Sequence, residues 1–135
     1  MTSPKTYTED FFDKTFQKSE IQKYHFNPKD MGRRDRKVVK HLSEFGLEGK
    51  ACLDIGPGTG RWLQFFRANN ASFLGALDIS QTSLDRCAGI FDSGHKINVE
   101  SDTFPFDSDT FDIAISFMVL EHLVDPTNYF SEIKR

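Results

Sequence analysis

The chain has 135 residues, the size of one domain, and its 38% hydrophobic and 27% charged content is typical of a folded globular protein. Its net charge of -3 is unlike the basic footprint of a nucleic-acid-binding protein, and no apolar run is long enough for a signal peptide or a membrane span. The two cysteines have no metal or redox spacing. Together these features predict a cytoplasmic protein without a membrane partner.

Residues 1–50 are predicted to form an N-terminal helical region. Apolar side chains at helical spacing indicate two helices, separated where Pro28 disfavours a helix at the preceding residue. The first helix has Tyr7, Phe11, Phe12 and Phe16 on one face. The second has Val38, Val39, Leu42 and Phe45 on one face and ends at Gly46. The basic run at 33–37 favours a solvated helix face, with a site for an anionic acceptor or a nucleic acid as the alternative.

From residue 51 the pattern changes to alternating strands and helices. The predicted strands are 51–55, 73–77, 97–99 and 111–117. The predicted helices are 61–69, burying Trp62, Phe65 and Phe66; 81–91, with Ser80 as N-cap and Gly94 as breaker; and 127–135, with Asp125 as N-cap and Pro126 at the first helical position. This alternation predicts an α/β fold with a doubly wound parallel sheet in a domain at 51–135.

The strongest functional signal is a glycine-rich loop between the first strand and its helix. It reads Asp54-Ile55-Gly56-Pro57-Gly58-Thr59-Gly60, a D-x-G-x-G-x-G spacing. Glycines let the backbone turn sharply and approach a ligand closely. The spacing differs from both the dinucleotide fingerprint and the P-loop. This segment resembles the first motif of class I S-adenosylmethionine-dependent methyltransferases.

The resemblance implies a Rossmann-like sheet of strand order 3-2-1-4 and S-adenosylmethionine as cofactor, with S-adenosylhomocysteine as product. It assigns the cofactor to the glycine loop residues Asp54, Gly56, Pro57, Gly58 and Gly60. Asp78, at the end of the second strand, is expected to accept hydrogen bonds from the ribose hydroxyls. Ile79 is expected to pack on the adenine.

Two later segments extend the predicted site. In the loop after the third strand, Asp102 matches the residue that accepts from the adenine amino group, with Thr103 beside it. Phe117, at the end of the fourth strand, is expected to face the sulfonium, and Glu121 and His122 after it are candidates for a base or for orienting the acceptor. The related E-x-x-E-H metal motif is incomplete, because Met118 occupies its first position, so no metal is predicted.

The resembling family has seven strands, and only four are recognised here. The sequence therefore predicts a truncated domain without strands five to seven, whose strand at 111–117 is an open edge that pairs with a second copy or a partner. The predicted reaction is methyl transfer to a small-molecule acceptor by in-line displacement, incomplete in the isolated chain. The alternatives are a non-catalytic module that binds cofactor or a partner, and a nucleotide-dependent oxidoreductase.

Overall fold

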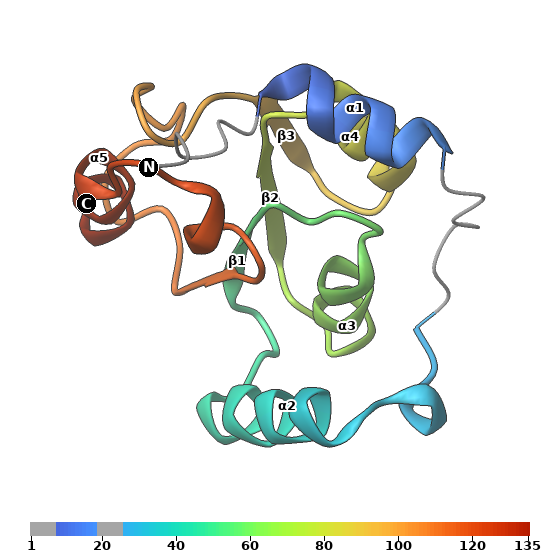
Figure 1. The fold of residues 1–135 in the computed structure, drawn as a ribbon. Helices are drawn as coiled ribbons and strands as arrows, with labels where there is room; N and C mark the ends of the chain where they lie inside the picture. The colour runs from blue at the N-terminus through green and yellow to red at the C-terminus, as the bar shows by residue number, and fades with distance from the viewer. Residues whose placement is uncertain (1–7, 19–25) are drawn as a thin grey trace.

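The computed structural model describes residues 8–18 and 26–135. Four parallel strands form one sheet in the order β3-β2-β1-β4, as predicted. Figure 1 shows α1 beside α4, with α2 and α3 on the other side of the molecule from α5. The strands are β1 (Ala51–Ile55), β2 (Phe73–Asp78), β3 (Ser93–Lys96) and β4 (Ile113–Ser116); the helices are α1 (Glu9–Lys18), η1 (Pro28–Asp30), α2 (Arg33–Phe45), α3 (Arg61–Ala68), α4 (Gln81–Cys87), η2 (Leu120–His122) and α5 (Thr127–Lys134).

The two central strands are the most buried part of the sheet. From Cys52 to Ile55 and from Leu74 to Asp78 every residue of β1 and β2 is buried. On one side they pack against a cluster that includes Trp62, Phe65 and Phe66 of α3, as predicted. Burial on both faces explains why these strands read as continuous apolar runs rather than alternating ones.

The second predicted helix is confirmed, and its basic run is only partly a solvated face. α2 ends at Gly46, whose φ of +71° is a conformation that glycine adopts without strain. Within the run, Asp35 is buried and its Oδ2 atom lies 2.6 Å from the Arg61 guanidinium. Phe45 departs from the predicted apolar face, because its side chain is 72% exposed.

The first predicted helix is also present, as α1. Phe11 is exposed and Phe12 is half-buried, so the two neighbouring rings have different surroundings. Tyr7 and the side chain of Phe16, the other members of the predicted apolar face, lie outside the described residues.

The predicted helix from Ser80 to about Phe91 is wrong at its end. Ser80 is the N-cap, and its hydroxyl accepts from the Ser83 amide at 3.2 Å, but α4 stops at Cys87. Gly89 follows with φ +88°, and this left-handed turn redirects the chain before it reaches Gly94, where the helix was expected to break. Gly94 has a different role: an added Cβ would lie 2.4 Å from the Phe91 ring.

The predicted third strand at 97–99 is wrong in position. The strand that pairs with β2 is Ser93–Lys96, with Gly75 opposite Ser93 and Asp78 opposite Lys96. Its residues have weak strand propensity, and the backbone pairing outweighs that local preference. The apolar residues Ile97 and Val99 instead line a cavity beyond the strand end.

The outer segments also differ from their predicted bounds. β4 is confined to Ile113–Ser116, because Phe111 turns its ring over Gly75 and Phe117 stacks on Trp62. Asp125 precedes the cap of α5 rather than forming it: Pro126 occupies the cap position, and Asp125 Oδ1 accepts from the Thr127 amide at 2.9 Å.

β4 is an edge strand that pairs with β1 among the described residues. Self-association through this edge stays a prediction. In the described part of the chain, none of the helices has the length and apolar character needed to cross a membrane.

Candidate functional site

A cavity of about 130 Å³ lies at the carboxyl ends of β1 and β2. In open α/β sheets this is the edge at which ligands bind. The part of its wall that belongs to the first two strands and their loops consists of Ile55, Gly56, Gly58, Leu77, Asp78 and Ile79. Four of these six are residues that the sequence predicted to bind the cofactor.

The glycine loop is shaped by its own backbone and by β2. The Gly56 amide donates to the Leu77 carbonyl at 2.7 Å, and the Gly60 amide donates to the Pro57 carbonyl at 2.8 Å. Gly56 has φ +74°, and a Cβ there would lie 2.4 Å from Cγ2 of Val119. The loop therefore requires glycine at this position for its conformation and for the close approach of the chain after β4.

Asp78 is held by the start of α4. The Ser80 amide donates to its Oδ1 atom at 2.9 Å, and the Ser83 hydroxyl donates to its Oδ2 atom at 2.7 Å. Burial raises the pKa of Asp78, while these bonds and those from the Gly58 and Ile79 amides oppose the increase. The carboxylate is thus oriented before any ligand arrives, and it lies in the cavity wall.

Asp54 is the most buried acid of the site, with 1% of its surface exposed. Its Oδ2 atom has no hydrogen-bond partner among the described residues. Burial, with repulsion from Asp78 as the second cause, raises the pKa of Asp54 to about 8. Near neutral pH this carboxyl therefore holds a proton beneath the glycine loop. Pro57 and Gly60 belong to the same loop and are buried, but they do not form part of the cavity wall.

The opposite wall comes from the segments after β3 and β4. After β3 it consists of Ile97, Asn98, Val99 and Glu100, and after β4 of Met118, Val119, His122 and Leu123. His122, one of the two predicted base candidates, is in this wall, whereas Glu121 is exposed and outside it.

Asp102 and Thr103 are exposed and lie outside the wall. The Asp102 carboxylate instead accepts from the Asn98 amide at 2.7 Å, which closes the loop on itself. Glu100 is the acid of this loop that reaches the cavity, and its Oε1 atom accepts from the Val124 and Asp125 amides at 2.6 and 2.8 Å. Sequence reasoning missed Glu100, although its nearness to the strand end was a usable signal.

Phe117 also lies elsewhere than expected. Its ring stacks on Trp62, with ring centroids 5.0 Å apart and an angle of 20° between the planes. It is packed against the main core and is absent from the cavity wall. The neighbouring Met118 and Val119 are in the wall instead. The abrupt turn at Met118, which has φ +59°, lies between Phe117, which packs against the core, and Val119, which lines the cavity.

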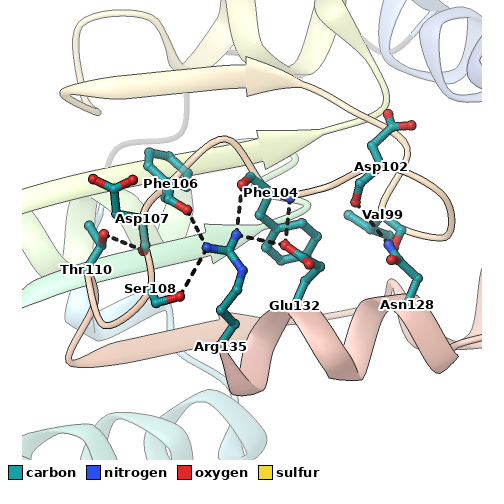
Figure 2. Close-up of polar contacts among 10 residues, drawn as sticks. All are labelled: Val99, Asp102, Phe104, Phe106, Asp107, Ser108, Thr110, Asn128, Glu132 and Arg135. Atoms are coloured by element: carbon teal, nitrogen blue, oxygen red, sulfur yellow. Dashed lines mark hydrogen bonds and ion pairs between the residues drawn. The ribbon is translucent and has the colours of Figure 1, made fainter.

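α5 fixes the loop at 99–110 (Figure 2). The Asn128 amide donates to the carbonyls of Val99 and Asp102 at 2.9 and 3.0 Å. The Arg135 guanidinium donates to the carbonyls of Phe104 and Phe106 at 2.9 and 2.8 Å. These contacts join positions far apart in sequence, and the Asn128 bond to Val99 supports the cavity wall directly.

Residues 28–135 match the family described as a methyltransferase domain. The chain belongs to this family. Part of it is 33% identical over 122 residues to the biotin biosynthesis bifunctional protein BioHC of Teredinibacter turnerae, an alignment that covers 78% of this chain and 21% of BioHC. The predicted resemblance to methyltransferases is confirmed.

Solved structures share the fold at low sequence identity. A SAM-dependent methyltransferase from Aquifex aeolicus has a TM-score of 0.61 at 21% identity, covering 96% of this chain and 66% of its own. A proposed S-adenosyl-L-methionine-dependent methyltransferase from Methanococcus maripaludis has a TM-score of 0.67 at 18% identity, covering 100% of this chain and 62% of its own. This methyltransferase-domain chain thus spans less than two thirds of the length of each of these relatives.

Proposed function

We propose that this chain binds S-adenosylmethionine in the cavity at the ends of β1 and β2, and that the protein transfers its methyl group to a small-molecule acceptor. The observation that carries the proposal is the oriented carboxylate of Asp78 beside the glycine loop, both in one cavity wall. The family match over residues 28–135 and the methyltransferases of the same fold support it.

The chemistry of the wall suits the parts of this cofactor. Asp78 places in the cavity wall a carboxylate, a hydrogen-bond acceptor of the kind to which ribose hydroxyls donate. Ile79 and Val99 offer apolar surface to an adenine. The carboxyl of Asp78 suits a ligand with a sulfonium and an ammonium, because an adjacent positive charge favours the ionised carboxylate.

The cofactor, when bound, supplies a methyl group on a sulfonium, a good leaving group that departs as a neutral thioether. The chain's own contribution is to hold the reactants close and aligned. Gly56 and Gly58 allow close backbone contact, and Asp78 fixes the nucleoside end. His122, in the wall on the β4 side, is the residue that we propose to take a proton from an acceptor that must lose one.

Titration calorimetry with S-adenosylhomocysteine tests the cofactor site. We expect saturable binding to the wild type and a loss of affinity of about tenfold or more in Asp78→Ala, since hydrogen bonds to a charged group contribute about 1.5–3 kcal/mol each. Asp85→Ala, an exposed change on the same α4 helix, is the matched control and should bind normally. A folded wild-type chain that fails to bind would refute the proposal.

A parallel titration with NAD addresses the oxidoreductase alternative. The D-x-G-x-G-x-G loop lacks the dinucleotide spacing, so NAD should neither bind measurably nor compete with S-adenosylhomocysteine. Competition at comparable concentrations would favour the oxidoreductase over the methyltransferase.

A further inference from the structure

Helix α1 contributes to a cavity that the rest of the chain forms from residues 55–123. Phe12 is the member of the cavity wall that comes from α1. Its ring meets the His122 ring edge-on, with ring centroids 5.3 Å apart and an angle of 69° between the planes. Phe12 therefore touches the same histidine that faces the ligand space from the β4 side.

Side chains hold α1 in this place at two further points. Asp13 Oδ1 accepts from the Ser80 hydroxyl at 2.5 Å and from the Thr82 amide at 3.4 Å. Glu9, near the start of the helix, forms an ion pair with Lys96 at the end of β3. α1 thus bridges β3, α4 and η2 across the carboxyl ends of the strands, and Figure 1 shows it running alongside α4.

The contact of Asp13 with Ser80 connects α1 to Asp78, the carboxylate that is proposed to bind the ribose. The Ser80 hydroxyl donates a hydrogen bond to Asp13, and the Ser80 amide donates one to Asp78 Oδ1. One residue therefore joins α1 to the side chain proposed to bind the ribose. The Ser80–Asp13 hydrogen bond also holds the pKa of Asp13 below its ordinary value. The attachment of α1 and the position of Asp78 are therefore mechanically linked.

With α1 in place, the cavity is smaller than a typical cofactor site. With α1 in place the cavity has about 130 Å³, whereas sites for small molecules and cofactors usually have roughly 300–1,000 Å³. The half-buried Phe12 ring occupies part of the wall. Asp13 and Glu9 hold α1 through side-chain hydrogen bonds and an exposed ion pair. These contacts are weaker than the strand pairing beneath them.

We propose that α1 is a cover of the ligand cavity, latched by Asp13 on Ser80, that opens to admit the ligand and closes with Phe12 against it. The proposal rests on the proposed cofactor site and adds a specific closing element to it. Asp13 acts as a positioning residue through Ser80, and Phe12 acts by direct contact with the bound ligand.

The test measures how fast S-adenosylhomocysteine binds to and leaves the full chain, by surface plasmon resonance. A weaker latch leaves the cavity open more often, so Asp13→Ala should raise both the association and dissociation rates, the latter by about five- to tenfold. Asp10→Ala, an exposed aspartate on the same helix, is the matched control and should leave both rates unchanged. Loss of structure alone would not accelerate association.

Phe12→Ala separates the cover from the latch. It should raise the dissociation rate several-fold while the circular dichroism and melting temperature of the chain stay near those of the wild type. Amide hydrogen exchange should also show α1 becoming more protected when S-adenosylhomocysteine is added.

The outcomes separate the two proposals. A wild type that does not bind S-adenosylhomocysteine refutes the cofactor site. If the wild type binds, three results would overturn the cover and leave the cofactor site intact. They are Asp13→Ala rates within about twofold of the Asp10→Ala control, slower association of Asp13→Ala, and unchanged hydrogen exchange in α1.

Discussion

The two walls of the cavity are held by different kinds of contact. On the β1–β2 side, Asp78 is bonded to Ser80 and Ser83, its close neighbours in sequence. On the side formed by residues 97–123, Glu100 is bonded to amides 24 and 25 residues away, and the Val99 carbonyl to Asn128. Local contacts form with little loop-closure cost, whereas the distant ones depend on the folded sheet. The first wall is therefore encoded by a motif and the second by packing.

The largest effect is expected where the two walls meet. Gly56→Ala puts a Cβ 2.4 Å from Val119 Cγ2 and a side chain at φ +74°, a conformation that costs about 1–2 kcal/mol in itself. We expect S-adenosylhomocysteine affinity to fall by about tenfold or more, because loop and wall must separate. Titration calorimetry of wild type and Gly56→Ala measures the two affinities.

The double variant Gly56→Ala with Val119→Ala checks the cause of that loss. Removing the Val119 methyl groups relieves the clash but not the backbone strain, so affinity should recover in part. Equal affinities of the single and double variants would show that the two walls do not press on each other at this point.

The next effect concerns Asp54, the buried acid beneath the glycine loop. The pKa of Asp54 is raised to about 8, so between its unfolded value near 4 and about 8 the folded chain holds a proton that the unfolded chain has lost. Its contribution to stability is complete below pH 4 and is lost as the pH rises to about 8. Asp54→Asn removes this dependence.

Urea unfolding of wild type and Asp54→Asn at pH 5, 6, 7 and 8 measures the pH dependence of stability that Asp54 causes. The stability of Asp54→Asn relative to wild type should rise with pH by up to about 1.4 kcal/mol per pH unit, and should level off above pH 8. A relative stability that is flat across this range would mean that Asp54 ionises normally in the folded chain.

The smallest effect belongs to the wall held from a distance. Asn128→Ala removes the bonds to the carbonyls of Val99 and Asp102 (Figure 2), and should cost about 1–2 kcal/mol of stability. It should also weaken S-adenosylhomocysteine binding a few-fold, since Asn98 to Glu100 lose support. Ser131→Ala, an exposed change on α5, is the control, and thermal melts with calorimetry compare the two. An unchanged affinity would show that the loop holds its shape without α5.

The sequence determined the features whose causes are local. The D-x-G-x-G-x-G loop specifies left-handed turns that glycine adopts readily, the continuous apolar runs specify buried central strands, and Ser80 specifies the start of α4. These residues carried the resemblance to methyltransferases, and that resemblance implied the order of the strands and the place of Asp78 in the site.

Tertiary structure decided the rest. β3 formed from Ser93–Lys96 because the backbone of β2 was there to pair with, against the local propensity that favoured 97–99. Phe117 turned to Trp62, and Glu100 rather than Asp102 reached the cavity, because loop direction depends on distant partners such as Asn128. The position of Phe12 in the wall likewise required α1 to dock on α4, since a helical periodicity shows an apolar face but not the surface that it covers.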